Sequence, residues 1–327
     1  MQEYQKLLHQ LTEAIDKEQD LLNATSPNQM YEPMAYILSL GGKRVRPLLT
    51  LVGCDLFDVT TNNAIHSALA VELFHNFSLI HDDILDKAPL RRGNTTVHEK
   101  WNTNIAILSG DGMMVKAFDE LCKSNPAHIH DLLKLFSKTA LEVCEGQQFD
   151  MNFETQNKVS VDEYIHMITF KTAVLLGCSL QMGSICANTS ILNQNHIYEF
   201  GKNVGIAFQI LDDVLDVYAT DDKFGKQIGG DIISNKKTFL VLKALEIAPE
   251  TMRNDLLALF SDSDLSNSKK VANVTSIFNA LDIKNNAINE ANKYTDIALT
   301  HLSKITATES KKNTLKEFAF HLLNREI

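Results

Sequence analysis

Apolar residues recur at helical spacing along most of the chain. Between residues 3 and 22, for example, Leu7, Leu11 and Ile15 fall on one face of a helix. A further helix is expected to begin at Pro47, and no stretch of useful length alternates like a strand. Other helices are expected over 33–40, 63–87, 128–149, 161–187, 194–218, 239–247, 251–260, 268–279, 282–304 and 309–324. The pattern predicts an all-α protein, a single domain over residues 1–327 whose helices form a bundle around a central cavity.

Two of these expected helices each carry three aspartates within an apolar run. The aspartates are Asp82, Asp83 and Asp86 in the helix 63–87, and Asp212, Asp213 and Asp216 in the helix 194–218. The first and last of each set are four residues apart and share one helix face, where like charges destabilise a helix. Carboxylates beside apolar side chains also lose hydration unless a cation compensates. One such cluster could be a solvated acidic face, but two copies favour a Mg²⁺ site shared with substrate phosphate.

Cationic residues gather in turns that precede or follow these helices. Gly41-Gly42-Lys43-Arg44-Val45-Arg46 leads into Pro47, and Arg91-Arg92 follows the first acidic cluster. A glycine-rich segment with several lysines, residues 225–237, follows the second cluster. Backbone amides at a helix start, together with Lys and Arg, bind phosphate, and a loop of this kind can close over it. The Gly41–Arg46 turn and the segment 225–237 could instead be solvated surface turns, and Arg91-Arg92 could simply be ion partners of the aspartates.

Two further polar positions lie inside apolar helices. His75 comes seven residues before Asp82, about two helical turns, so both side chains can face one cavity. Such a histidine could equally be a hydrogen-bonded core residue. Lys171-Thr172 occupies the middle of the helix 161–187, where a lysine that does not extend to solvent requires an anion.

Charge and cysteine usage restrict the function and the compartment. The chain has 31 Lys and Arg against 41 Asp and Glu, a formal net charge of -10, which argues against nucleic-acid binding. Its five cysteines form no CxxC pair, and we expect them to be reduced core residues of a cytoplasmic protein. The N-terminal residues contain no apolar signal segment, and no apolar run reaches the length of a membrane span.

Taken in order, these motifs resemble the trans-polyprenyl diphosphate synthase family, in particular its short-chain farnesyl and geranylgeranyl diphosphate synthases. The shared motifs are Gly-Gly-Lys-Arg-x-Arg-Pro from Gly41, His-Asp-Asp-x-x-Asp from His81 with a following Arg-Arg-Gly, Lys171-Thr172, Phe208-Gln209-x-x-Asp-Asp-x-x-Asp, and Gly225-Lys226-x-x-Gly-Gly-Asp-Ile. The resemblance implies the isoprenoid synthase fold, a homodimer and about three Mg²⁺ ions per active site. It also implies a head-to-tail condensation, in which isopentenyl diphosphate attacks the cation formed from an allylic diphosphate.

The same resemblance assigns roles to matching positions. Mg²⁺ would be held against the allylic diphosphate by Asp82, Asp86 and Asp212, supported by Asp83, Asp213 and Asp216. The allylic diphosphate would also be bound by Arg91, Lys171, Lys226 and Lys236, and isopentenyl diphosphate by Lys43, Arg46, His75 and Arg92. Oxygens of Thr172 and Gln209, with the backbone carbonyl of Lys171, would face the carbocation.

Product length and the type of reaction leave alternatives. The family limits its chains largely at the fifth and fourth residues before the first aspartate, here Phe77 and Ser78. One large and one small residue favour a twenty-carbon product, with fifteen carbons as the close alternative and a hexa- to octaprenyl product less favoured. A terpene cyclase would need no second diphosphate site, and a non-catalytic partner subunit typically lacks an acidic cluster. A metal-dependent phosphohydrolase would release phosphate without forming a carbon–carbon bond.

Overall fold

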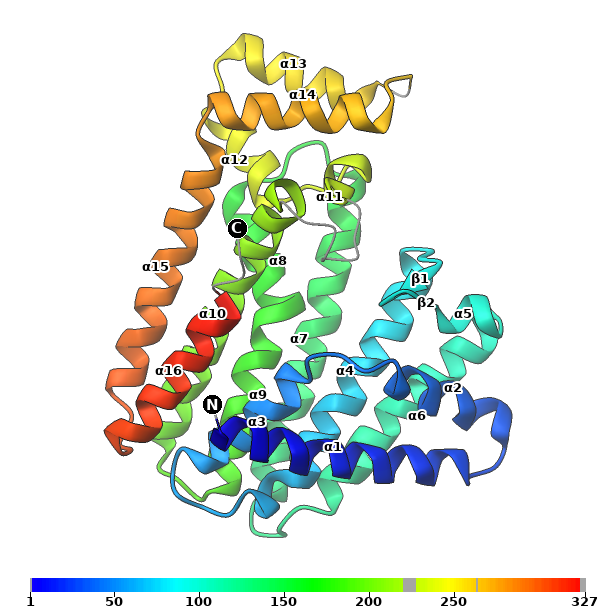
Figure 1. Ribbon diagram of the computed structural model, residues 1–327, viewed down its shortest axis with the longest axis vertical. Helices are drawn as coiled ribbons and strands as arrows, with labels where there is room; N and C mark the ends of the chain where they lie inside the picture. The colour runs from blue at the N-terminus through cyan, green and yellow to red at the C-terminus, as the bar shows by residue number, and fades with distance from the viewer. Residues whose placement is uncertain (1, 220–227, 263, 324–327) are drawn as a thin grey trace. The chain divides into compact units, whose positions relative to one another are not determined.

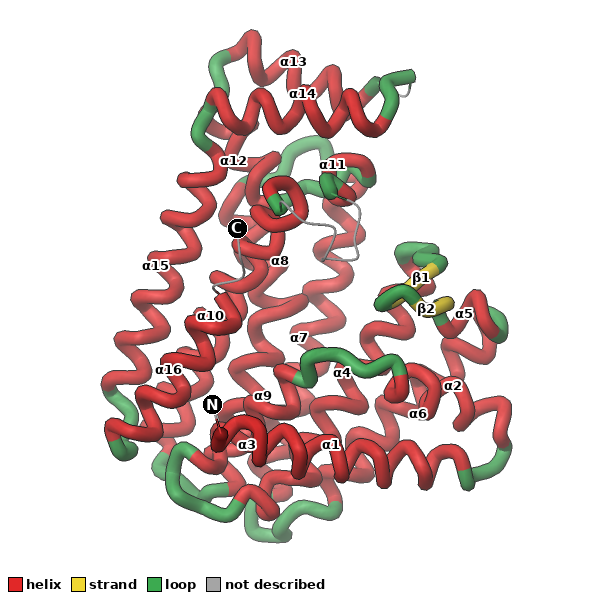
Figure 2. Tube along the Cα trace, viewed as in Figure 1, coloured by secondary structure: helices red, strands yellow, loops and turns green. Residues whose placement is uncertain are grey.

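The computed structural model of the protein describes every residue except 1, 220–227, 263 and 324–327. The described residues are almost entirely helical (Figures 1 and 2), which confirms the all-α prediction. The α-helices are α1 Gln2–Asn23, α2 Asn28–Ser39, α3 Val45–Asp55, α4 Ile65–Leu85, α5 Val97–Lys100, α6 Thr103–Cys122, α7 Ile129–Thr155, α8 Val161–Ile168, α9 Val174–Cys186, α10 Ile191–Tyr218, α11 Gly230–Ile233, α12 Phe239–Ile247, α13 Glu250–Ser261, α14 Asn267–Ala280, α15 Ile283–Ser303 and α16 Glu309–Leu323. A 3₁₀ turn spans Thr61–Ala64, and the short strands β1 Leu90–Arg91 and β2 Asn94–Thr95 pair antiparallel.

Helix α6 has no counterpart among the helices expected from the sequence. Its glycines, Gly110 and Gly112, lie at close contacts with neighbouring helices. A Cβ atom at Gly110 would lie 2.5 Å from the His81 ring, and one at Gly112 would collide with Met30 and Met34. The two glycines therefore allow α6 to pack closely on α4 and α2.

The chain contacts divide the protein into two units, and each is described by itself. Unit 1 comprises residues 1–140, 178–198 and 305–312. Its central helix is α4, which packs chiefly on α6 and α3. All residues from Ser67 to Phe74 are buried, so this part of α4 is covered on every side, as expected for a helix that is apolar all round.

Unit 2 comprises residues 141–177, 199–304 and 313–327. Its core is formed by apolar side chains of α8, α10, α12, α14 and α15, with Val214, Phe239 and Phe278 among the most buried. The expectation of a single domain stays a prediction.

The predicted helix 161–187 is interrupted in its middle. Residues Thr169–Ala173 form a π turn between α8 and α9. A Cβ atom at Gly146 of α7 would lie 2.6 Å from the Cα of Lys171, and one at Gly205 of α10 would lie 2.7 Å from the Cα of Ala173. Two glycines thus let neighbouring helices approach the backbone of the π turn, where functional residues are frequently found.

The helical stretch Val161–Cys186 is long and apolar enough to cross a membrane by length and composition. However, 78% of its most apolar window is buried inside the protein, as in the core helix of a soluble protein.

The cysteines require a correction, because only Cys54, Cys178 and Cys186 are buried. Cys122 and Cys144 are exposed rather than part of the core.

Candidate active site

The first acidic cluster lies at the end of α4, and its middle aspartate is held by an arginine. Asp83 is only 2% exposed and accepts hydrogen bonds from Nε of Arg91 at 2.8 and 2.9 Å and from its Nη2 at 2.7 Å. Burial raises the pKa of Asp83, and the Arg91 guanidinium opposes that shift. Asp82 is partly exposed, and its Oδ2 lies 3.5 Å from Nη2 of Arg91. Asp86 is exposed at the end of the helix.

The middle aspartate of the second cluster is held in the same way by other donors. Oδ2 of Asp213 accepts a 2.5 Å hydrogen bond from the Tyr164 hydroxyl and a 2.9 Å hydrogen bond from the backbone N–H of Phe239. Burial raises the pKa of Asp213 to about 8, although these hydrogen bonds oppose the shift. Asp212 and Asp216 are half-buried on α10, and Oδ2 of Asp216 accepts the backbone N–H of Asp231 at 3.1 Å.

These contacts separate the aspartates of each cluster into two kinds. The middle residues, Asp83 and Asp213, are occupied by protein donors, whereas the first and last residues lie at more exposed positions. Hard carboxylate oxygens one helical turn apart fit Mg²⁺. Among the described residues, no three His, Cys, Asp or Glu side chains are already gathered around a metal position. The assignment of all six aspartates as metal ligands stays a prediction.

A buried carboxylate, Glu72, organises the basic residues of unit 1. Glu72 is 3% exposed, accepts from Nη1 of Arg44, and accepts from the Asn76 amide at 2.7 Å. Nη1 of Arg46 lies 3.2 Å from Nε2 of His75, one turn along α4 from Glu72. The resemblance assigned Arg46 and His75 to isopentenyl diphosphate, and the sequence placed Arg44 only in the general phosphate-binding turn and gave Glu72 no role. The sequence signal that could have identified Glu72 is its position three residues before His75 on the same expected helix.

The charges in this cluster favour binding of an anion. Burial lowers the pKa of Arg46 to about 10, with Glu72 opposing and Arg92 adding to the shift. Nε of Arg46 is buried without a hydrogen-bond partner in the described structure. Burial, followed by the charges of Arg46 and Arg92, lowers the pKa of His75 well below its ordinary value, so the imidazole is neutral near pH 7. An oxygen of a diphosphate could accept a hydrogen bond from the unpartnered Nε of Arg46 and balance the charge of its guanidinium.

The structure brings Arg92 onto the Gly41-Gly42 turn, about fifty residues earlier in the chain. Arg92 and Gly93 have φ values of +53° and +75° in the two-residue connection of the β1–β2 hairpin, as a type I′ turn requires. Nη1 of Arg92 donates to the carbonyl of Gly41. A Cβ atom at Gly42 would lie 2.8 Å from the guanidinium, so glycine makes room for Arg92. Lys43 is exposed on the same turn.

In unit 2, the π turn presents Lys171 and Thr172 beside α7 and α10. Nζ of Lys171 lies 2.5 Å from Oδ2 of Asp150, and the Thr172 hydroxyl donates to Oε1 of Gln209 at 3.3 Å. Nε2 of Gln209 is 3.5 Å from Oδ1 of Asp213. The structure therefore connects two predicted site residues, Thr172 and Gln209, to Asp213 of the second cluster. The sequence did not predict a role for Asp150, because the helix was expected to end at residue 149. It did not predict a role for Tyr164 either, because Tyr164 follows the ordinary apolar pattern of its helix.

The remaining predicted residues have different outcomes. Lys226 lies outside the described residues, and Lys236 follows α11, with its backbone N–H bonded to the Asp231 carbonyl at 2.9 Å. The Phe77 ring contacts the rings of Phe74 and His81, with centroids 5.5 and 4.7 Å apart. The Ser78 hydroxyl donates to the His75 carbonyl at 2.8 Å. The role of Phe77 and Ser78 in product length stays a prediction.

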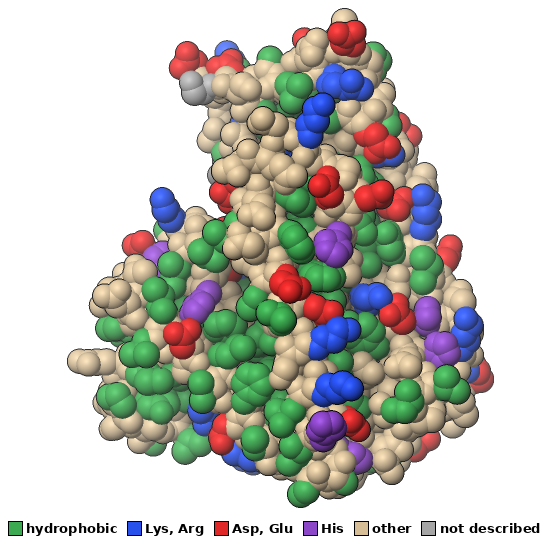
Figure 3. Space-filling view, turned by 180° about the vertical axis from the view of Figure 1, so that it is seen from behind, with side chains coloured by type: hydrophobic (Ala, Val, Ile, Leu, Met, Phe, Trp, Pro, Cys, Tyr) green, Lys and Arg blue, Asp and Glu red, His purple; other side chains and the backbone are tan. Residues whose placement is uncertain are grey.

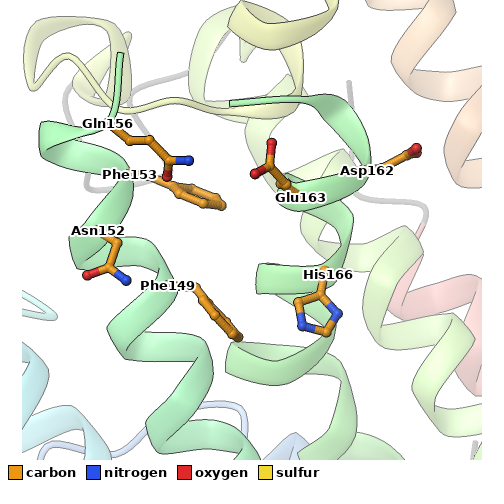
Figure 4. A pocket seen from close by; sticks show the side chains of 7 residues that line it. All are labelled: Phe149, Asn152, Phe153, Gln156, Asp162, Glu163 and His166. Atoms are coloured by element: carbon orange, nitrogen blue, oxygen red, sulfur yellow. The ribbon is translucent and has the colours of Figure 1, made fainter. Parts of the chain in front are cut away.

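An apolar cavity of about 470 Å³ lies between α7 and α8 in unit 2. Figure 4 shows the Phe149 and Phe153 rings and the His166 ring facing its interior. The lining residues are Phe149, Asn152, Phe153, Gln156, Asp162, Glu163 and His166. None of the residues predicted from the sequence lines this cavity, so it is distinct from the candidate active site.

The described all-α chain thus carries two Asp-rich helices, a Lys-Thr π turn and an arginine-rich turn. Residues 27–281 match the family model described as polyprenyl synthetase. The chain is 39% identical over 229 residues to a geranylgeranyl diphosphate synthase of Methanosarcina mazei, covering 69% of this chain and 71% of that protein. It is 34% identical over 315 residues to a geranylgeranyl pyrophosphate synthase of Geoglobus acetivorans, covering 95% of each.

The fold comparison agrees with the sequence comparison. A solved geranylgeranyl pyrophosphate synthase superposes with a TM-score of 0.94 at 40% identity, over 99% of each chain. The chain therefore belongs to the polyprenyl synthetase family and is a prenyltransferase.

Proposed function

We propose that this enzyme condenses isopentenyl diphosphate head to tail with an allylic diphosphate and that its main product is geranylgeranyl diphosphate. The observation that carries the proposal is the matching build of the two acidic clusters. In each, protein donors hold the middle aspartate while the first and last occupy more exposed positions one turn apart. The names of the relatives that are 34–39% identical support the product.

The proposal assigns the outer aspartates Asp82, Asp86, Asp212 and Asp216 to Mg²⁺ and to the allylic diphosphate. Bound Mg²⁺ would act as a Lewis acid on the leaving diphosphate. Lys171, Lys236 and Arg91 would bind the diphosphate oxygens and neutralise charge as the C–O bond breaks. The Thr172 and Gln209 oxygens, which lie 3.3 Å apart, would direct negative dipoles at the allylic cation.

The second substrate would bind to the basic cluster around Glu72. The guanidinium of Arg46 has a buried Nε without a partner, and its Nη1 lies beside His75. Lys43 belongs to the Gly41-Gly42 turn, and Arg92 donates to the same turn. The double bond of isopentenyl diphosphate attacks the allylic C1, which forms the new carbon–carbon bond. The intermediate then loses a proton from C2, and the departing diphosphate accepts it. This step explains why the proposal needs no dedicated side-chain base.

The test is a product assay with the purified chain. It is incubated with Mg²⁺, isopentenyl diphosphate and, separately, five-, ten- and fifteen-carbon allylic diphosphates, and the dephosphorylated products are sized by chromatography. The expected result is a twenty-carbon alcohol that disappears when EDTA removes the metal. A fifteen-carbon product would make it a farnesyl diphosphate synthase, and a longer product would place it with longer-chain synthases. Cyclic hydrocarbon, or diphosphate release without elongation, would overturn the condensation itself.

We also propose a cytoplasmic homodimer that pairs through the outer face of α6. Leu108 and Val115 are seven residues apart on this helix and are 55% and 68% exposed, with Ile107 beside them at 42%. Figure 3 shows hydrophobic side chains gathered where this helix reaches the surface. Such an apolar patch is typical of a protein–protein contact.

Light scattering after gel filtration tests the dimer. The wild-type mass is expected to be twice that of the chain, and Leu108→Asp with Val115→Asp is expected to give a monomer. The matched control is Leu257→Asp, which changes an exposed leucine of α13 in unit 2 and should leave the dimer intact. A wild-type monomer, or a dimer that survives the double substitution, would contradict this interface.

A further inference from the structure

Lys270 of α14 is a buried lysine to which the proposed reaction gives no role. The residue is 6% exposed, although a lysine usually keeps its ammonium in water. The ammonium donates to Oδ1 of Asn235 and lies 5.2 Å from the centroid of the Phe260 ring. Burial lowers the pKa of Lys270. A cation placed at this cost in hydration requires a specific partner, and Asn235 is that partner.

Asn235 occupies the turn directly before Lys236, a residue assigned to the allylic diphosphate. Its φ of +57° is left-handed, a conformation that asparagine tolerates better than most residues. The turn is closed by hydrogen bonds from the Asn235 N–H to the Ile232 carbonyl at 3.2 Å and from the Lys236 N–H to the Asp231 carbonyl at 2.9 Å. Lys270 therefore fixes the side chain of the residue that sets the direction of the chain into Lys236.

The other end of the same segment is tied to the second acidic cluster. The Gly229 N–H donates to the Asp216 carbonyl at 2.7 Å, and the Asp231 N–H donates to Oδ2 of Asp216 at 3.1 Å. A Cβ atom at Gly229 would lie 2.7 Å from Val271, the neighbour of Lys270. The segment 229–236 is thus held by Asp216 on one side and by two consecutive residues of α14 on the other.

We propose that Lys270 is a positioning residue for the allylic-diphosphate site. Through Asn235 it holds the segment 229–236, and with it the Lys236 side chain and the donor to Asp216, in the arrangement that binds diphosphate. The inference rests on the proposed function, because that function assigns Lys236 and Asp216 to the allylic substrate. It adds α14, a helix with no residue in the predicted site, to the parts that determine substrate affinity.

Steady-state kinetics of Lys270→Met provide the test, with Lys269→Met as the matched control. Lys269 precedes Lys270 on α14 and is exposed, so both variants remove one lysine from one helix. A hydrogen bond from a charged donor corresponds to about a tenfold change in an equilibrium constant. We therefore expect the KM for the allylic diphosphate to rise about tenfold in Lys270→Met, with the KM for isopentenyl diphosphate within about twofold of wild type. Equal rises in both KM values, or no difference from Lys269→Met, would overturn the inference.

Asn235→Gly removes the acceptor while keeping a residue that favours positive φ, so it tests the same link from the other side. We expect it to reproduce the Lys270→Met effect, and we expect the double variant to be no worse than either single variant, because both remove one interaction. Additive effects of the two substitutions would show that Lys270 does not act through Asn235.

Hydrogen exchange separates this inference from the proposed function, since it needs no turnover. Without substrate, the amides of Asp231 and Lys236 should exchange about tenfold faster in Lys270→Met than in Lys269→Met or wild type. If wild type makes no elongated product, the proposed function fails, while exchange still decides whether Lys270 holds the segment. Unchanged exchange in Lys270→Met would overturn the inference even in an active prenyltransferase.

Discussion

The Tyr164 hydroxyl and the backbone N–H of Phe239 both donate to Oδ2 of Asp213, at 2.5 and 2.9 Å. Burial and the neighbouring carboxylate raise the pKa of Tyr164 well above its ordinary value, so the phenol keeps its proton and remains a donor. Asp213, the middle aspartate of the second cluster, is therefore fixed by α8 and by the start of α12. This arrangement makes the geometry of the second acidic cluster depend on a buried tyrosine of another helix, α8.

Replacing Tyr164 with Phe should therefore lower both stability and activity. The buried Asp213 loses a donor, so the free energy of unfolding is expected to fall by about 1–3 kcal/mol, as measured by denaturant titration. The turnover number should fall about tenfold because Asp212 and Asp216 lose their fixed orientation. Tyr218→Phe is the control, since Tyr218 donates to Asn279 at 3.1 Å at a more exposed position. Equal losses in the two variants would refute the special role of Tyr164.

Substitution of the buried and of the exposed aspartate in the first cluster is expected to have different effects, the first on stability and the second on turnover. Asp83→Asn should lower the free energy of unfolding by about 1.5–3 kcal/mol, because it leaves Arg91 without its buried carboxylate. Asp86→Asn changes an exposed carboxylate and should alter stability by less than about 0.5 kcal/mol. Its turnover should nevertheless fall about a hundredfold or more. A stable, active Asp86→Asn variant would remove Asp86 from the proposed metal site.

His75 predicts a pH dependence of stability with a definite sign. Its pKa is lower in the folded protein than the ordinary value near 6.5, so below that pH the unfolded state takes up a proton that the folded state does not. Stability should thus decrease as pH falls below about 6.5, by up to about 1.4 kcal/mol per pH unit. His75→Gln should lose this contribution, whereas the control His9→Gln, at an exposed position of α1, should retain it. Denaturant titrations at pH 5 to 8 provide the measurement, and identical profiles for wild type and His75→Gln would contradict the prediction.

The aromatic side chain of Phe77 is expected to limit product length. Phe77→Ala removes a ring that contacts Phe74 and His81, so the product should lengthen by at least one five-carbon unit. Chromatography of the dephosphorylated products gives the readout. Ser78→Ala is the control, because its hydroxyl bonds to its own helix and its removal hardly changes the volume. Unchanged products in Phe77→Ala would place the limit elsewhere in the protein.

Most helices of this chain were predictable, because the apolar spacing that predicts them also determines which face is buried. Helix α6 was not, since Gly110 and Gly112 are helix-weakening residues whose packing role depends on His81, Met30 and Met34. The end of α7 was predicted too early, because the polar cluster before Asp150 resembles a helix terminus, although the helix continues to Thr155.

Spacing also predicted both acidic clusters, but it could not show which aspartate faces inward. That difference depends on Arg91 for Asp83 and, for Asp213, on Tyr164, 49 residues earlier in the chain. Likewise, nothing in the local sequence shows that Gly42 leaves room for Arg92. Asp83 and Arg91 are close in sequence, but the partners in the Asp213–Tyr164 and Gly42–Arg92 contacts are too far apart in the chain for a short sequence window to contain both.

The π turn Thr169–Ala173 has a consequence for how this part of the chain can change in evolution. A π turn accommodates one residue more than an α-helical turn, and the helix on either side keeps its own apolar face. Loss of one residue here would leave a continuous α-helix whose flanking apolar positions still match the core. The same deletion would remove the bulge that displays Lys171 and Thr172. A descendant with that deletion would retain the fold without the arrangement of Lys171 and Thr172 that we propose to bind the allylic substrate, and an alignment gap at this position would identify it.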